Sequence, residues 1–293
     1  MDFPNRAEQV AKETNADGVG LLRLEFIIAA AGKHPAQYMR ENKDEEYITL
    51  LTNEIGKIAR AFGGKPVWAR CSDLRSDEYR NLDGGDQEPH ETDPMIGWHG
   101  IRRLLDEPRI LKAEFKAIRR LHDQGLTNVG IMLPFVIRAE EVKKAKEYLA
   151  YIFNDNLKSI KFGVMIETPA ACWVIEDICK VGIDFISFGT NDLTQTTLGL
   201  DRNNQRIQKQ FSEMHPAVLG EIAMVIKTCK KYNVETSICG QAASKPEMAE
   251  FLVRQGIDSV SPNPDVVHQI RHIVAQTERK LLLELERKRF EQK

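Results

Sequence analysis

Seven short apolar runs, each followed by a stretch with helical spacing, constrain the fold of this chain more than any other feature. The runs lie at residues 18–22, 67–70, 129–133, 162–166, 184–188, 235–239 and 258–261. Such regular alternation predicts an α/β fold in which helices cover a parallel sheet. A length of 293 residues suits a single TIM-type (β/α)8 barrel.

A closed barrel of this type has eight strands, so one strand is missing from the count. It should precede the first predicted helix, at residues 6–16, where only residues 1–5 remain. We therefore expect a single barrel domain over residues 1–293 that is a fragment of a longer chain, cut within or just after its first strand. The Leu-, Lys- and Glu-rich tail at 277–293 predicts a C-terminal surface helix that packs through Leu281–Leu285.

Two neighbouring strands are followed by carboxylates. Glu167 follows the run 162–166, and Asn191 and Asp192 follow the run 184–188. Either acid alone could simply cap a helix. Because the carboxyl ends of parallel barrel strands share one mouth, the two together favour a site. Carboxylate oxygens suit Mg²⁺, which proteins commonly hold with one or two carboxylates and substrate oxygens.

Arginines and a thiol occupy the same position in other units of the pattern. Arg23 follows the run 18–22, Arg70 ends the second run, and Arg202 follows the polar segment after Asp192. Cys239 ends the sixth run, where a small buried strand residue is the ordinary alternative to a functional role. The polar segment Arg75–Asp93 is too long for an ordinary barrel connection and is a candidate functional loop.

Composition limits the class of protein. Charged residues make up 29% and hydrophobic residues 42%, and the formal net charge is -2, which lacks the basic excess of a nucleic-acid binder. The apolar runs are too short to cross a membrane, and no signal peptide is apparent, so we expect a cytoplasmic protein. The five cysteines form no CxxC pair and indicate free thiols, with Cys172 and Cys179 in the core.

Six motifs, in order along nearly the whole chain, resemble the phosphoenolpyruvate-binding barrel of a known enzyme family. They are GVGLLRLEFII, VWARCSDLRSDEYRNLDGG, NVGIMLPFV, GVMIETPAA, FISFGTNDLTQTTLGLDRNN and CGQAAS. The family contains phosphoenolpyruvate synthase, pyruvate phosphate dikinase and Enzyme I of the sugar phosphotransferase system. The segments GIDSVSPNPD and GQAAS favour the synthase.

The resemblance implies that a phosphohistidine on a swivelling domain meets pyruvate at this barrel and that phosphoenolpyruvate is formed. It assigns Mg²⁺ binding to Glu167 and Asp192, and substrate orientation to Asn191. It also implies partners, namely pyruvate or phosphoenolpyruvate, the phosphohistidine and ATP-binding domains of a full-length enzyme, and a second copy of the barrel in a homo-oligomer. We find no phosphohistidine segment and no nucleotide-binding region, so we expect that this chain alone does not turn over ATP.

The resemblance further assigns phosphoryl binding to three arginines and proton exchange at the pyruvate methyl carbon to the thiol. These residues are Arg23, Arg70, Arg202 and Cys239. Guanidinium groups match phosphate oxygens in geometry, which agrees with the assignment. We expect nearby Mg²⁺ and arginines to lower the pKa of the thiol.

One position departs from the family pattern, because His99 stands where well-known members carry arginine. A histidine makes no bidentate contact and is only partly charged near neutrality. Weaker affinity, substitution by Arg102 or Arg103, and a harmless difference of lineage all remain open from the sequence.

Two other functions compete with this hypothesis. A lyase or aldolase barrel of the same superfamily also uses Glu and Asp on Mg²⁺, but it does not predict the three arginines and the thiol. A non-catalytic dimerisation module would bind no substrate.

Overall fold

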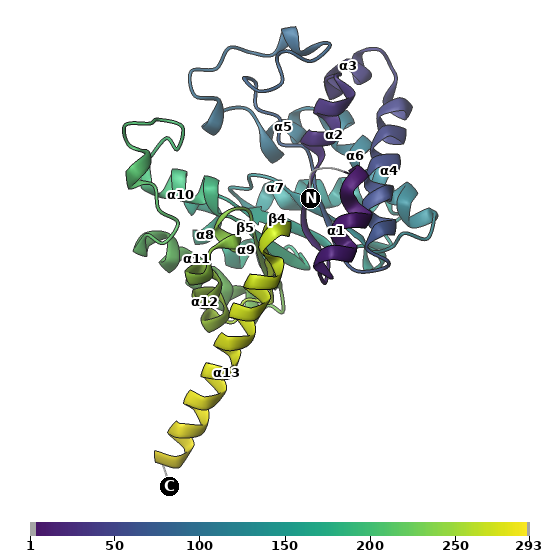
Figure 1. The fold of residues 1–293 in the computed structure, drawn as a ribbon. Coiled ribbons are helices and arrows are strands. Elements are labelled where there is room, and N and C mark those ends of the chain that lie inside the picture. The colour runs from purple at the N-terminus through teal and green to yellow at the C-terminus, as the bar shows by residue number, and fades with distance from the viewer. Residues whose placement is uncertain (1–3, 292–293) are drawn as a thin grey trace.

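Seven parallel strands form the centre of the protein, whose computed structural model describes residues 4–291. The strands are joined in chain order in one sheet (Figure 1). Their bounds are β1 (Val19–Arg23), β2 (Val67–Arg70), β3 (Val129–Leu133), β4 (Phe162–Ile166), β5 (Phe185–Gly189), β6 (Glu235–Cys239) and β7 (Ser259–Ser261). All seven predicted runs are therefore strands, with bounds that differ from the prediction by one residue or less.

The sheet curls into a nearly closed TIM-type barrel, as predicted. Gly20 in β1 has no side chain, and a Cβ atom there would lie 2.6 Å from the Cβ atom of Ser261 in β7. The first and last strands therefore approach each other closely, although the hydrogen-bonded order runs only from β1 to β7. The remnant of an eighth strand expected at residues 1–5 lies largely outside the described residues, and Pro4–Arg6 form a 3-10 turn.

Helices follow the strands and cover the outside of the barrel (Figure 1). Most of them begin at a proline or an acidic first turn, both of which favour a helix start. The helices are α1 (Ala7–Thr14), α2 (Leu24–Ala31), α3 (Pro35–Arg40), α4 (Asp44–Ala61), α5 (Gly100–Asp106), α6 (Pro108–Asp123), α7 (Ala139–Ile152), α8 (Pro169–Trp173), α9 (Ile175–Lys180), α10 (Thr190–Leu198), α11 (Pro216–Lys231), α12 (Pro246–Gln255) and α13 (Val267–Glu291).

Two hydrophobic clusters hold these layers together. The larger one lies between the sheet and the helices and includes the fully buried rings of Tyr47, Phe115 and Phe188. The smaller one fills the barrel interior with Met132, Met165, Phe185 and Cys239. Because the interior is filled with side chains below, the space for a ligand lies above them, at the carboxyl ends of the strands.

The C-terminal tail differs from the prediction in extent and in packing. Helix α13 is continuous from Val267 and extends away from the barrel (Figure 1), so the tail at 277–293 belongs to a longer helix. Leu282, Leu283 and Leu285 are exposed, so the predicted packing stripe is wrong. Packing against the barrel instead uses the earlier turns, where Ile270 and Thr277 are buried.

Among the described residues, no helix is long and apolar enough to cross a membrane. All five cysteines are buried free thiols, and Cys172 and Cys179 lie in the core as predicted.

Candidate active site

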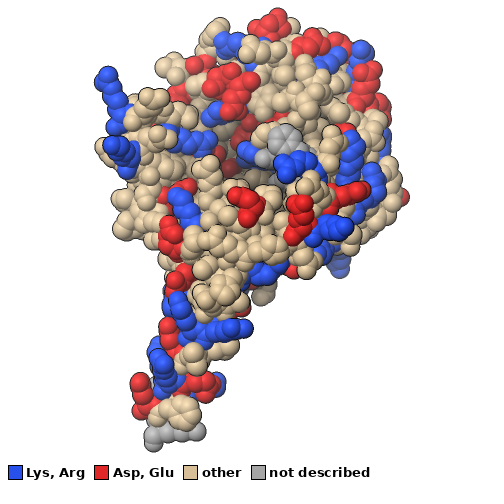
Figure 2. All heavy atoms as spheres, viewed as in Figure 1, with Lys and Arg blue, Asp and Glu red and all other residues tan. Residues whose placement is uncertain are grey.

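All eight residues that the sequence singled out line one cavity of about 1020 Å³ at the carboxyl ends of the strands. Figure 2 shows the molecular surface hollowed in this region, with acidic and basic side chains around the opening. The eight residues are Arg23, Arg70, His99, Glu167, Asn191, Asp192, Arg202 and Cys239.

The strand register explains why these residues meet. Arg23 is the register partner of Arg70 at the ends of β1 and β2. Gly189 at the end of β5 is the partner of Cys239 at the end of β6. Neighbouring parallel strands therefore end at the same level, and the residues that terminate them open into the same space.

Both candidate metal ligands line the cavity wall, where Glu167 is buried and Asp192 is half-buried. Glu167 is 1% exposed, and one of its carboxylate oxygens accepts a hydrogen bond of 2.8 Å from the backbone N–H of Phe135. Asp192 lies in the first turn of α10, with Oδ1 2.9 Å from a guanidinium nitrogen of Arg202. Burial raises the pKa of Glu167 and of Asp192. Nearby negative charge from Asp73 adds to both increases.

This environment fits a divalent cation held by few protein ligands. Within residues 4–291, no group of three or more His, Cys, Asp and Glu side chains could hold a metal ion by itself. Two carboxylates whose anionic forms are disfavoured by desolvation and by nearby negative charge would gain from a bound cation. Mg²⁺ characteristically keeps waters or substrate oxygens as its other ligands, so a two-carboxylate site suits it better than a structural metal.

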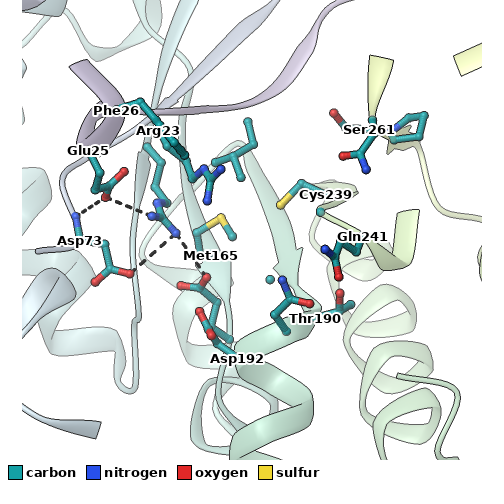
Figure 3. Close-up of a pocket in the computed structure, with 18 of the residues that line it drawn as sticks. Arg23, Glu25, Phe26, Asp73, Met165, Thr190, Asp192, Cys239, Gln241 and Ser261 are labelled. Carbon is teal, nitrogen blue, oxygen red and sulfur yellow. Dashed lines mark hydrogen bonds and ion pairs between the residues drawn. The ribbon is translucent and has the colours of Figure 1, made fainter. Parts of the chain in front are cut away.

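Arg70 is fixed by three carboxylates. It is buried, and its guanidinium nitrogens lie 3.0 Å from Glu25, 3.7 Å from Asp73 and 3.7 Å from Glu167. Figure 3 shows Glu25 and Asp73 on one side of the cavity, while Cys239 and Ser261 lie on the opposite side. Burial alone would lower the pKa of Arg70. The negative charge of these acids outweighs burial and raises the pKa well above its ordinary value, so Arg70 stays positively charged.

The other two arginines reach the cavity from different elements. Arg23 ends β1, and its guanidinium lies over the ring of Phe26, 4.3 Å from the ring centroid. Arg202 follows α10 and pairs with Asp192 across the opening. Three guanidinium groups therefore face the cavity from β1, from β2 and from the segment after α10.

His99 is buried and makes two short polar contacts instead of pointing freely into the cavity. Its Nδ1 lies 2.6 Å from Asp73 Oδ1, and its Nε2 lies 2.7 Å from the carbonyl oxygen of Met95. Both partners are acceptors, so both ring nitrogens donate when the ring is an imidazolium. Burial opposes this charge, but Asp73 more than compensates and raises the pKa of His99.

The structure also decides which neighbouring arginine could replace the family arginine. Arg103 is buried and pairs with Glu88 and Glu107, away from the cavity lining. Arg102 donates to the carbonyl oxygens of Ile96 and Gly97 and does not line the cavity either. Of these three side chains, only His99 lines the cavity in this arrangement.

Cys239 lies in the barrel interior at the base of the cavity. It is 3% exposed, and its thiol donates to the carbonyl oxygen of Phe188 at 3.5 Å. Burial raises the pKa of the thiol to about 11, although Ser187 and Arg70 act in the opposite direction. The expected lowering of the thiol pKa is therefore wrong for the ligand-free chain, because desolvation outweighs the nearby positive charge.

Several charged residues of the cavity were given no individual role in the sequence analysis, among them Glu25, Asp73 and Arg75. Glu25 and Asp73 each lie two or three residues beyond a strand-end arginine, so the rule that found Arg23 and Arg70 could have found them. Arg75 begins the long polar segment and reaches the cavity only because this segment folds back over the barrel mouth.

A barrel with carboxylates, arginines and a thiol at the carboxyl ends of its strands is the architecture of an enzyme domain that handles an anionic substrate. Residues 1–279 match the sequence profile of the family described as "PEP-utilising enzyme, PEP-binding domain", in which PEP is phosphoenolpyruvate. The chain belongs to this family.

Proteins with similar sequences are known from several archaea. The chain is 53% identical over 281 residues to the phosphoenolpyruvate synthase of Pyrococcus furiosus, which covers 96% of this chain and 34% of the relative. It is 53% identical over 279 residues to the probable phosphoenolpyruvate synthase of Pyrococcus abyssi, with 95% and 34% coverage. The chain therefore spans about a third of the length of these relatives.

Solved structures with low sequence identity share the fold. The citrate synthase SbnG superposes with a TM-score of 0.53 at 14% identity, covering 96% of this chain and 91% of that chain. The malate synthase of Haloferax volcanii superposes with a TM-score of 0.55 at 14% identity, covering 90% and 62%. These similarities concern the barrel architecture alone.

Proposed function

We propose that residues 1–293 form a single phosphoenolpyruvate- and pyruvate-binding barrel domain of a phosphoenolpyruvate synthase. In the proposed reaction, a phosphoryl group passes from a phosphohistidine on another domain to the enolate of pyruvate. The observation that supports this most directly is that one cavity is lined by Glu167, Asp192, Arg23, Arg70, Arg202 and Cys239. The ATP-dependent steps are assigned to phosphohistidine and ATP-binding domains outside these residues.

Glu167 and Asp192 would hold Mg²⁺, because they are the carboxylates of the cavity that follow the adjacent strands β4 and β5. When bound, the ion would stabilise negative charge that develops on the substrate oxygens. Asn191 precedes Asp192 in the same helical turn and lines the cavity, so its amide can donate to the carboxylate of pyruvate. The substrate would thereby be oriented with its methyl group away from the two acids.

Arg23, Arg70 and Arg202 would bind the phosphoryl group. Arg70 is already oriented by Glu25 and Asp73, so little side-chain entropy is lost when it binds an anion. Arg202 is half-buried and pairs with Asp192, so ligand binding would require it to exchange this carboxylate for phosphoryl oxygens. The same movement would free Asp192 to ligate the ion.

Cys239 would move the proton at the methyl carbon of pyruvate. With a pKa raised to about 11, the thiol is protonated at neutral pH and suited to act as the acid when phosphoenolpyruvate is consumed. In that direction the S–H bond breaks, the proton joins the methylene carbon, and a thiolate remains. In the synthetic direction the thiolate accepts a methyl proton, and the electron pair of the C–H bond moves into the enolate.

Proton exchange tests this proposal without the missing domains. Pyruvate in D₂O with Mg²⁺ should exchange its methyl protons in the presence of the chain, as followed by proton NMR. Cys239→Ala should lower the protein-dependent rate by at least about a hundredfold, the lower end of the range for a general acid or base. Cys172→Ala is the matched control, because Cys172 is buried in α8 outside the cavity. Equal rates for wild type and Cys239→Ala would exclude the assigned role.

Calorimetry separates this proposal from its rivals. Phosphoenolpyruvate should bind with heat that depends on Mg²⁺, and Arg70→Met should weaken it because a guanidinium contact to phosphate is lost. A lyase or aldolase barrel would tolerate loss of the phosphoryl-binding arginines. A dimerisation module would show no Mg²⁺-dependent heat at all.

A further inference from the structure

Glu114 is a buried carboxylate that lies outside the cavity and has no part in the proposed chemistry. It is on α6 and is 1% exposed. It accepts hydrogen bonds from three donors: the Tyr47 hydroxyl at 3.1 Å, the Ser72 backbone N–H at 3.1 Å, and the Ser72 hydroxyl. A buried carboxylate is costly unless it is fully hydrogen-bonded, and an apolar side chain would pack more cheaply.

Ser72, which donates two of these bonds, lies between two residues of the cavity wall. Arg70 precedes it at the end of β2, and Asp73 follows it. On the other side of the segment 70–73, Glu25 accepts hydrogen bonds from the Asp73 backbone N–H and from Arg70. The segment 70–73 is therefore held between two buried carboxylates, one in the cavity wall and one behind it.

We propose that Glu114 is a positioning residue that sets the geometry of Arg70 and Asp73 through Ser72. The two hydrogen bonds that Glu114 accepts from Ser72 fix both the backbone and the side chain of Ser72. Hydrogen bonds to a charged acceptor are stronger than those between neutral groups. Loss of the acceptor leaves the buried Ser72 N–H unsatisfied, which displaces the segment. The effect on ligand binding rests on the proposed function, whereas the effect on the backbone does not.

The charge of Glu114 makes this positioning sensitive to pH. Burial raises its pKa to about 7, and nearby Glu25 on α2 acts in the same direction. The other titratable groups facing it are Tyr47 on α4 and Cys71 after β2, whose own pKa values burial raises further. Glu114 is therefore an anion at alkaline pH. Below about neutral pH it becomes a neutral acid. The carboxyl oxygen that carries the proton is then a donor and no longer accepts a hydrogen bond from Ser72.

Glu114→Gln tests the positioning directly, because it removes the charge while keeping the shape. Hydrogen–deuterium exchange measured by mass spectrometry should show faster exchange of the Ser72 and Asp73 amides, by about tenfold, with unchanged exchange in β4. Tyr47→Phe is the matched control: it removes one bond to Glu114 but leaves both bonds to Ser72, so these amides should stay protected. Unchanged protection of Ser72 and Asp73 in folded Glu114→Gln would overturn the proposal.

Ligand binding provides the second measurement. The Mg²⁺-dependent affinity of wild type for phosphoenolpyruvate should be weaker at about pH 6 than at about pH 8, and part of this difference should disappear in Glu114→Gln but remain in Tyr47→Phe. Glu114→Gln should bind about tenfold more weakly than wild type at the higher pH. An unaltered pH profile in Glu114→Gln would contradict the proposal, since a purely structural defect would not flatten it.

Two further outcomes keep the tests separate. If wild type binds no phosphoenolpyruvate with Mg²⁺, the proposed function fails, and amide exchange alone decides whether Glu114 positions the segment. If Glu114→Gln does not fold, Ser72→Ala takes its place in the test. This variant removes the hydrogen bond from the Ser72 hydroxyl to Glu114 and should weaken the binding of phosphoenolpyruvate by about threefold. Wild-type affinity in folded Ser72→Ala would then count against the proposal.

Discussion

At the scale of single residues, the cavity is a set of charges whose state depends on burial. Arg70 is permanently charged because three acids surround it, whereas the thiol of Cys239 is protonated because burial dominates. Burial opposes the charged form of His99, but Asp73 and the carbonyl oxygen of Met95 favour it and raise the pKa of the ring. These states follow from desolvation and partners together, and residue type alone would assign several of them incorrectly.

The His99–Asp73 pair predicts a pH-dependent contribution to stability. The pKa of His99 is raised in the folded chain, so its contribution is complete below the unfolded value and is lost as pH rises through the folded value. Urea unfolding of wild type and His99→Gln should therefore differ most at about pH 6 and converge at alkaline pH, with a difference of about 1–3 kcal/mol at the lower pH. A constant difference across this range would show that His99 acts through packing alone.

At the scale of elements, the long segment Arg75–Asp93 is held to the barrel by one buried ionic cluster. Glu88 pairs with Arg103 of α5 at 2.6 and 2.8 Å, and His34 before α3 lies 3.2 Å from the same carboxylate. His34 uses Nδ1 to accept from the Ala36 N–H, so its Nε2 can donate to Glu88 in the neutral ring. A segment that appears irregular in sequence is thus anchored over the cavity mouth.

Removing one partner of this cluster should be far more costly than removing an exposed ion pair. Arg103→Met leaves the carboxylate of Glu88 buried with His34 as its remaining side-chain partner, so we expect a loss of about 3–5 kcal/mol in the free energy of unfolding. Arg119→Met removes a partly exposed pair with Asp123 on α6 and should cost less than about 1 kcal/mol. Chemical denaturation measures both, and similar losses in the two variants would contradict the anchoring role.

At the scale of the whole molecule, a nearly closed barrel carries a helix that leaves it. Helix α13 packs against α12, and beyond Leu281 its described side chains are exposed. The barrel and its cavity therefore do not depend on the last turns of α13. The exposed leucines of these turns form an apolar surface without a described partner in residues 4–291.

Truncation after Leu281 should leave the barrel intact. The turns removed contribute mainly a partly exposed ion pair between Glu284 and Arg254, so the free energy of unfolding should change by less than about 1 kcal/mol. Circular dichroism and thermal unfolding at two protein concentrations provide the measurement. A larger loss that depends on concentration would show that another copy of the chain covers these leucines.

The sequence alone was sufficient for the order of the elements and for the residues at the strand ends. Apolar runs and helical spacing are local patterns, so all seven strands were predictable, and Glu167, Asp192 and Cys239 followed from their positions at strand ends. The extent of α13 was less predictable, because one continuous helical pattern does not show where packing ends.

The tertiary structure alone decided which charges meet and in which state. Glu25 and Arg70 are 45 residues apart, and Ser72 and Glu114 are 42 apart, so no local pattern records either contact. The high thiol pKa of Cys239 and the double hydrogen bonding of His99 likewise depend on burial by distant elements. Hydrophobic periodicity is written along the chain, whereas desolvation and ion pairing arise only when remote segments pack together.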